Sequence, residues 1–115
     1  MLENRNLSLA ERRELRLAAL AEKASRDADL LRLHQFAADV LGTDEGPVVC
    51  AQALAHVEIW ARDSLCSRKY IVAWRKMLRM TPSAFRAEIL REGDEGVALR
   101  QNTPFGFLRE RMLWQ

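Results

Sequence analysis

The spacing of apolar residues along the chain is that of helices. Apolar side chains recur three and four positions apart over most of the sequence, which places them on one face of an α-helix. No stretch of five or more residues alternates apolar and polar side chains as a half-buried strand does. Ala, Leu, Arg and Glu dominate the composition, and all four favour helix. We therefore expect an all-α fold, a compact bundle of five to six helices in one domain over residues 1–115.

The N-terminal third of the chain predicts two helices with a break between them. A capping box that begins at Ser8 marks the start of the first helix, expected over about 9–24. Ser25 or Asp27 is suited to cap the second helix, expected over about 28–41. The first helix has the thinnest apolar stripe in the chain, so it is the element expected to project from the bundle as an arm.

Turn and cap residues divide the rest of the chain into shorter helices. Pro47 and the pair Thr81–Pro82 are typical of helix starts, and Gly93 is typical of a helix end. Residues 1–25 include the helix with the thinnest apolar stripe, so this segment is expected to be the one least tied to the bundle. The further helices are expected over about 47–62, 68–79, 82–92 and 105–113, with one or two helical turns over 97–101.

The cysteines and the N-terminus bear on the compartment. Cys50 and Cys66 have no CxxC or metal-ligand spacing, so reduced thiols are the simplest interpretation. The N-terminus has no apolar run like that of a signal peptide, and no stretch approaches the ~20 apolar residues of a membrane span. We expect a cytoplasmic protein without a membrane partner.

No residue pattern of a known catalytic, cofactor or metal site is present, so we expect no enzyme, no cofactor and no metal. His34 and His56 lie far apart without a second ligand at metal-binding spacing, and His34 is expected to be a solvated or capping residue on a helix surface. Cys66 lies close to Arg68 and Lys69, which could lower its pKa, but a small apolar residue between two helices is the simpler interpretation. The five glycines form no phosphate-binding loop.

Charge is balanced along the chain except in two neighbouring segments. Residues 42–66 carry one base and four acids, whereas residues 67–79 carry five bases and no acid. Such uneven charge is informative about surface partners rather than about the fold. The candidate residues for binding a partner or nucleic acid are Arg68, Lys69, Arg75, Lys76 and Arg79.

Two interpretations of this basic segment remain open. In the first, the bases are only the solvated face of a helix whose other side, with Tyr70 and Trp74, is core. In the second, they bind an acidic protein surface or nucleic acid, and the aromatic residues contact the partner. The sequence does not decide whether Tyr70 and Trp74 are core or contact residues.

Residues 61–79 can also be compared with a DNA-binding helix-turn-helix, in which the second helix enters the major groove. A regulator of this kind is expected to be a homodimer. Leu65 stands where the motif usually has a turn glycine, which is a departure. The positions that fit the motif are Ala61, Cys66, Ser67, Ile71 and Trp74.

The most distinctive sequence segment lies in the C-terminal part of the chain and reads ALRQNTPFGFLRER at 98–111. Together with Tyr70 and Trp74, it resembles a group of small bacterial helical proteins that share Tyr-x-x-x-Trp followed by LRQ-polar-polar-PF. The likeness covers roughly residues 60–113. Members of that group look like the antitoxin partners of nucleotidyltransferase-type toxins, so the resemblance implies an antitoxin role and no catalytic residue.

The LRQNTPF segment has a structural interpretation as well. Asn102 or Thr103 can end one helix and cap the next, with Phe105 packed on the bundle. Arg100, Gln101 and Asn102 are the secondary candidates for partner contact.

The leading hypothesis is a non-enzymatic bacterial interaction protein, an antitoxin that covers a toxin by direct binding. A basic helix would be attracted to the carboxylates with which nucleotidyltransferases hold Mg²⁺. If the toxin surface is basic instead, the acidic segment 42–66 is the better contact. The alternative is a helix-turn-helix DNA-binding regulator that uses residues 61–79.

Overall fold

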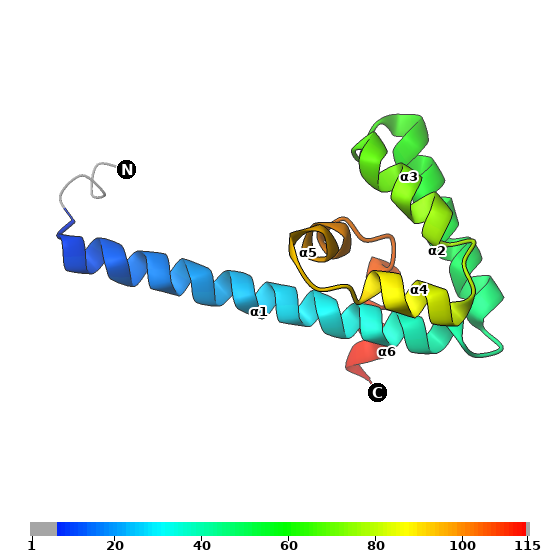
Figure 1. Ribbon diagram of the computed structural model, residues 1–115, viewed down its shortest axis with the longest axis horizontal. Coiled ribbons are helices and arrows are strands. Elements are labelled where there is room, and N and C mark those ends of the chain that lie inside the picture. The colour runs from blue at the N-terminus through cyan, green and yellow to red at the C-terminus, as the bar shows by residue number, and fades with distance from the viewer. Residues whose placement is uncertain (1–6, 115) are drawn as a thin grey trace.

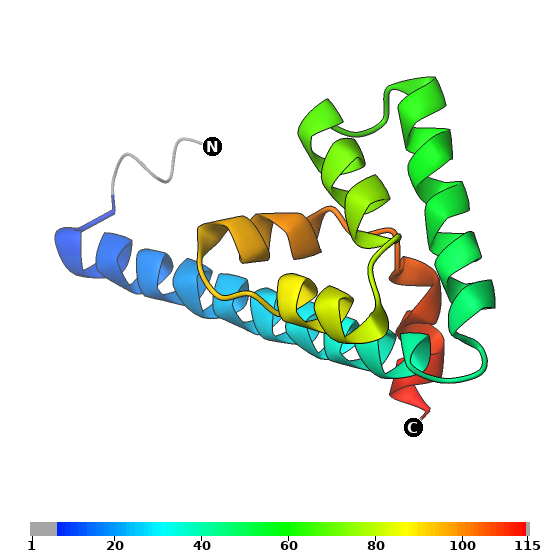
Figure 2. The ribbon, with the colours of Figure 1, turned by 45° about the vertical axis from the view of Figure 1, so that its right-hand side comes forward.

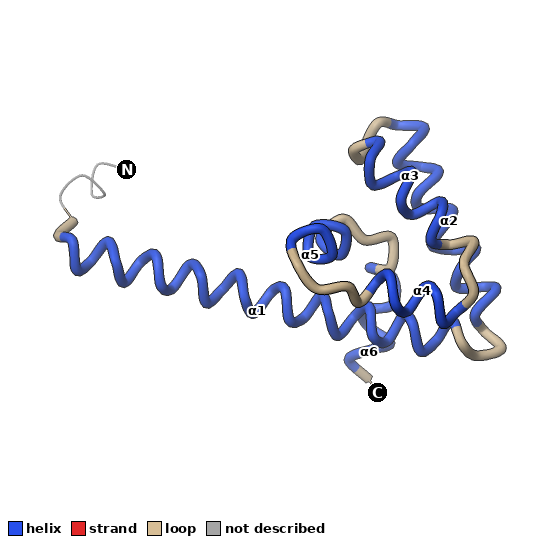
Figure 3. The backbone as a smooth tube through the Cα atoms, viewed as in Figure 1, coloured by secondary structure: helices blue, strands red, loops and turns tan. Residues whose placement is uncertain are grey.

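The computed structural model of the chain describes residues 7–114, and this part is all-α. No strand occurs within residues 7–114, so the prediction of an all-α bundle with five to six helices is confirmed (Figure 3). In chain order the elements are α1 (Leu9–Leu41), α2 (Gly46–Asp63), α3 (Arg68–Met77), α4 (Pro82–Ile89), α5 (Asp94–Gln101), the short 3-10 helix η2 (Gly106–Leu108) and α6 (Arg109–Leu113).

α1 is one continuous helix, so the predicted break within it is wrong. It starts with the expected capping box: the Glu11 N–H donates to the Ser8 hydroxyl over 3.1 Å, and the Ser8 N–H donates to the Glu11 carboxylate over 3.2 Å. Ser25 and Asp27 lie inside the helix, and Asp27 accepts a 2.9 Å hydrogen bond from Lys23 one turn earlier. No Gly or Pro lies within its 33 residues, and a Ser and an Asp cost too little helix propensity to end it.

α1 has a buried C-terminal half and an exposed N-terminal half. Leu33 and Ala37 have no exposed surface, whereas every residue from 9 to 26 is exposed. Figure 1 shows the exposed half extending well beyond the other helices. We call residues 9–26 the arm. Residues 1–6 of the segment expected to project lie outside the described residues.

An aromatic cluster joins the C-terminal segment to the bundle. The ring of Phe105 meets those of Trp74 and Phe85 edge to face, with centroids 5.9 and 5.7 Å apart. Trp74 has no exposed surface, and its indole N–H donates to the carbonyl of Asn102 over 2.8 Å. Trp74 is therefore a core residue, which answers half of the question that the sequence left open.

His34 is buried, so its expected place on a helix surface is wrong. Its Nδ1 lies 2.6 Å from the carbonyl of Leu30, and its Nε2 lies 2.6 Å from the hydroxyl of Thr103. Because a carbonyl can only accept, Nδ1 carries the proton, and the Thr103 hydroxyl donates to Nε2. Burial, aided by the charges of Arg100 and Arg109, lowers the pKa of His34 from 6.5 to about 4. The neutral imidazole thereby ties α1 to the segment between α5 and η2.

α2 and α3 form a hairpin that stands away from α1. Figure 2 shows α3 running back alongside α2 after a short turn. Ser64 makes that turn in the left-handed conformation, with φ of 54°, and Cys66 is half-buried against the core. The interpretation of Cys66 as a small apolar residue between helices is thus confirmed. None of the helices in the described part of the chain combines the length and the apolar character needed to cross a bilayer.

Candidate partner-binding site

α3 has one apolar face and one basic face because its apolar residues recur at helical spacing. Ile71, Trp74 and Met77 are buried on the inner side. The outer side carries four of the five bases singled out in the sequence, together with the half-exposed side chain of Val72. The fifth, Arg79, lies in the turn after α3, because the helix ends at Met77 and not at the expected residue 79.

One of the five bases is already engaged within the chain. Arg75 donates two hydrogen bonds to the carboxylate of Glu58 on α2, over 2.8 and 2.6 Å. These bonds lower the pKa of Glu58 and raise that of Arg75. Arg75 is therefore a link between α2 and α3, and its charge is offset locally.

The other four bases are exposed and lack such a partner. Within residues 7–114, no carboxylate lies within 4.0 Å of their charged nitrogens. Together they leave four positive charges without an ion pair on the outer side of α3 and in the turn that follows it. We call this set the basic face, and its members are Arg68, Lys69, Lys76 and Arg79.

The arrangement of α2 and α3 differs from that of a helix-turn-helix. In that motif the two helices cross at roughly 90–120°. Here α3 lies alongside α2, and the Arg75–Glu58 pair joins the two helices across the hairpin (Figure 2). Leu65, at the position of the usual turn glycine, is 64% exposed, and the left-handed residue is Ser64 instead. The pair is better described as an αα-hairpin.

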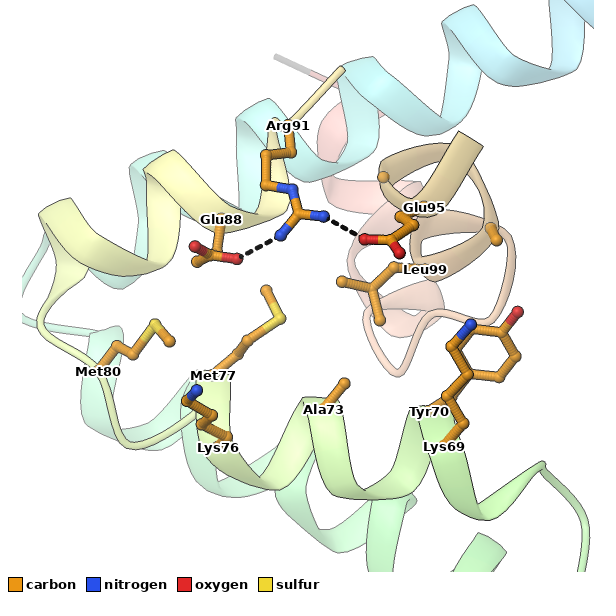
Figure 4. A pocket seen from close by; sticks show the side chains of 12 residues that line it. Lys69, Tyr70, Ala73, Lys76, Met77, Met80, Glu88, Arg91, Glu95 and Leu99 are labelled. Atoms are coloured by element: carbon orange, nitrogen blue, oxygen red, sulfur yellow. Dashed lines mark hydrogen bonds and ion pairs between the residues drawn. The ribbon is translucent and has the colours of Figure 1, made fainter. Parts of the chain in front are cut away.

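A cleft of about 360 Å³ lies between α3 and the α4–α5 region (Figure 4). Met77 and Ala73 point into it from α3, and Leu99 points into it from α5. Tyr70 is half-buried at one end of the cleft and Met80 at the other, so Tyr70 lines a cavity rather than filling the core. Methionines adapt their shape to a bound group, which suits this floor to an apolar side chain.

The two rims of the cleft carry different charge. Lys69 and Lys76 lie on the α3 rim and belong to the basic face. On the opposite rim, Arg91 donates to Glu88 over 3.2 Å and to Glu95 over 2.6 Å. Arg91 is the one base lining that rim, and its charge is offset by Glu88 and Glu95. Among the residues that line the cleft, the bases without an ion pair are therefore the two lysines on the α3 side.

Of the three secondary contact candidates, Arg100 is buried and does not face the surface. The residue is 6% exposed, and its guanidinium donates to the carbonyls of Ile89 and Arg91 over 2.9 and 2.8 Å. A cation that binds the last carbonyls of a helix stabilises the helix end, here that of α4. Gly96 makes this possible, since a Cβ there would lie 2.0 Å from the Arg91 carbonyl oxygen.

The other two candidates differ from each other. Gln101 is exposed, and its amide donates to Asp27 over 3.3 Å, which links α5 to α1. Asn102 is half-buried and ends α5, with its amide donating to the carbonyl of Ala98 over 2.8 Å. The LRQNTPF segment is therefore mainly a structural connection, and its first residue, Leu99, lines the same cleft as Lys69 and Lys76.

The cleft itself was not predicted from the sequence. Its lining residues come from α3, α4, α5 and the turns beside them, and they lie up to 30 positions apart in the sequence. No local pattern predicts that Met77 and Leu99 face each other across a gap.

In the described part of the chain, no three His, Cys, Asp or Glu side chains gather as metal ligands. Comparisons with known protein families, with curated proteins and with solved structures found no match for this chain.

Proposed function

We propose that this chain is a non-enzymatic protein that binds an acidic partner protein through the basic face of α3 and the adjoining cleft. The observation that carries the proposal is the combination of an open apolar floor with uncompensated lysines along one rim. An apolar pocket supplies most of the binding free energy, and the charges on its rim select the partner and its orientation.

The shape of the site suits a helix as the bound element. Lys69 and Lys76 are seven residues apart on α3, about 10 Å along the helix axis. A helix lying along the cleft would match them with two carboxylates spaced seven residues apart. Its apolar side chains, three or four positions from these carboxylates, would enter the floor beside Met77 and Leu99.

In the cell, the chain would act as an antitoxin that binds a toxin through this site. The resemblance through Tyr70, Trp74 and the LRQNTPF segment implies a toxin of the nucleotidyltransferase type as partner. The catalytic region of such a toxin is acidic because carboxylates hold its Mg²⁺. A basic face would be attracted to that region and would cover it, which is how a bound antitoxin would neutralise the toxin.

The test has two steps. The tagged full chain is first used to recover partners from its host after nuclease treatment, and the main protein recovered is produced separately. The affinity of this recovered protein is then measured for the wild-type chain and for the Lys69→Glu/Lys76→Glu variant of the chain. Reversing both charges should weaken binding about tenfold or more, and the effect should shrink as salt is raised.

Two further variants locate the contact. Ala73→Phe fills the cleft from its half-buried position and should weaken binding without changing the charge. Arg12→Glu/Arg16→Glu is the matched control, since these two bases are exposed on the arm, away from α3. If the control weakens binding as much as the Lys69/Lys76 variant while Ala73→Phe has no effect, the partner does not use the cleft and the proposal is rejected.

Nucleic acid is the second candidate partner, favoured by the four uncompensated bases of the basic face. DNA binding would not follow helix-turn-helix geometry, given the αα-hairpin. Affinity for duplex DNA should then fall by about 0.9 log units per log unit of salt for each phosphate contacted. Recovery of nucleic acid from a sample that is not treated with nuclease, without a protein partner and together with such a salt slope, would favour this candidate over the antitoxin.

A further inference from the structure

A second apolar pocket of about 180 Å³ lies at the Met80 end of the cleft. It opens between the turn that joins α1 to α2 and the turn that joins α3 to α4. Met77 and Met80 line both the cleft and this pocket, so the two cavities are neighbours that share a wall of two methionine side chains. We call it the side pocket, and its other walls include Leu41, Pro47, Cys50, Pro82 and Phe85.

The chemistry of the side pocket is apolar. Among the described residues that line it, none carries a charged side chain. Its one polar side-chain group is the Cys50 thiol, which already donates a hydrogen bond to the Leu78 carbonyl over 3.1 Å. A charged group that entered the pocket would lose its hydration without gaining a partner there. The side pocket therefore selects an apolar group.

The backbone around the side pocket is held in place by the fold. Phe85 is buried, and Pro47 and Pro82 stand in the first turns of α2 and α4, where the proline ring fixes the backbone angle φ. Where α2 meets the end of α1, the two segments are in close contact, since a Cβ on Gly46 would lie 2.3 Å from the Leu41 carbonyl oxygen. A preformed pocket needs little ordering when it is filled, so it binds its ligand more tightly than a flexible one.

The volume of the side pocket matches one aromatic ring. In another protein, an engineered apolar cavity of about 150 Å³ binds benzene. At about 180 Å³ the side pocket has room for a phenyl ring and is too small for a larger element of structure. Met77 and Met80 suit such a ring as neighbours, because methionine side chains adapt their shape and the sulfur makes favourable contacts with aromatic rings.

We infer that the side pocket receives one aromatic side chain of the partner helix that lies along the cleft. The inference rests on the proposed function for the identity of that helix. Side chains four and seven positions apart on one helix face are separated by about 6 and 10 Å, so one helix can fill both the cleft and the side pocket.

Charge near the side pocket favours the same partner. Figure 4 shows Lys76 beside Met77 on the cleft rim, and Arg79 comes immediately before Met80 in the chain. Neither base forms an ion pair within residues 7–114. A carboxylate on the partner helix, close to its aromatic residue, would therefore be attracted to this end of the cleft. An aromatic side chain held in a pocket commonly supplies a large share of the binding free energy of an interface.

Benzene is the probe for the side pocket in the free full-length chain, and the ¹³C-labelled methionine methyl groups are the reporters in NMR spectra. Benzene should shift the Met77 and Met80 signals in a saturable way, because a bound ring changes the magnetic field at nearby methyl groups. Met112 is the internal control, since it lines neither the cleft nor the side pocket. Cys50→Phe, which places a ring in the side pocket, should abolish the shift of Met80, whereas Ala73→Phe, which fills only the cleft, should preserve it.

Three results of the benzene experiment would overturn the inference. The first is a wild-type chain in which neither Met77 nor Met80 shows a saturable shift. The second is a shift that Ala73→Phe abolishes and Cys50→Phe preserves, since benzene would then bind in the cleft. The third is a set of Met77 and Met80 signals that change with the concentration of the chain alone, since a second copy would then fill the pocket.

Affinity for the recovered partner protein separates this inference from the proposed function. Cys50→Phe should weaken binding about tenfold or more, and the matched control Cys50→Ser, which keeps the pocket open, should leave binding unchanged. If Ala73→Phe weakens binding and Cys50→Phe does not, the helix uses the cleft without the side pocket, so the inference is overturned while the proposed function stands. If the Lys69→Glu/Lys76→Glu variant and Ala73→Phe both keep full affinity, the proposed function fails and the inference fails with it.

Discussion

The buried imidazole of His34 should make the fold sensitive to acid in a way that one substitution removes. In the unfolded chain, His34 takes up a proton as the pH falls through 6.5, its ordinary pKa. In the folded chain the pKa is about 4, so the folded state resists protonation over the interval between these values. Stability from this group is therefore complete above pH 6.5 and is lost as the pH falls toward 4.

The size of the effect follows from the two pKa values. A difference of one pKa unit corresponds to about 1.4 kcal/mol, so a depression from 6.5 to about 4 corresponds to about 3 kcal/mol. This is a large part of the total stability of a small domain, which is about 5–15 kcal/mol. The main physical cause is the loss of solvation on burial, and the charges of Arg100 and Arg109 act in the same direction.

Urea unfolding at a series of pH values between 7 and 4 measures this term. His34→Gln is neutral throughout, so its free energy of unfolding should fall by about 3 kcal/mol less than that of the wild type over this range. Carboxylates whose pKa is lowered in the fold, such as Asp27 and Glu58, titrate in both proteins and cancel in the comparison. His56→Gln is the control, because that imidazole is exposed. Parallel pH profiles for the wild type and His34→Gln would refute the reasoning.

Two further predictions concern local packing. Gly96→Ala should destabilise the fold by about 1–3 kcal/mol, because its Cβ would lie 2.0 Å from the Arg91 carbonyl oxygen, whereas Gly106→Ala, with no atom within 4 Å, should change stability by less than about 1 kcal/mol. Thermal unfolding of the two variants checks this, and equal losses would contradict it. A double-mutant cycle with Arg75→Ala and Glu58→Ala should give only a weak coupling, which salt weakens further, since the pair is exposed. A strong coupling that salt does not change, measured by chemical unfolding, would contradict this and would mean that the pair fixes the α2–α3 hairpin.

The sequence predicted those features of the fold that depend on interactions between residues close together in the chain. The Ser8 capping box and the Thr81–Pro82 start are set by hydrogen bonds and dihedral angles within one turn, and both lie where the sequence predicts. The amphipathic character of α3 follows from the spacing of its own residues. The break near Ser25 was wrongly predicted. The preference of Ser and Asp for helix caps is too weak to interrupt a helix that contains no Gly or Pro.

The places of three polar residues were decided only by tertiary packing. His34 and Arg100 are buried because partners far along the chain satisfy them: Thr103 is 69 residues from His34, and the Ile89 carbonyl is 11 residues from Arg100. No local pattern distinguishes such residues from solvated ones, since burial of a polar group depends on where its hydrogen-bonding partners come to lie. The same holds for Arg75, whose charge is offset by Glu58 from the neighbouring helix.

The sequence by itself determined the all-α class, most helix boundaries and the basic character of one helix, because these depend on residues within a few positions of one another. The tertiary structure decided which bases of that helix are free, where the cleft lies, and which side of α1 is covered. These properties depend on contacts between segments distant in sequence, and the chain specifies such contacts only through the packing of the whole core.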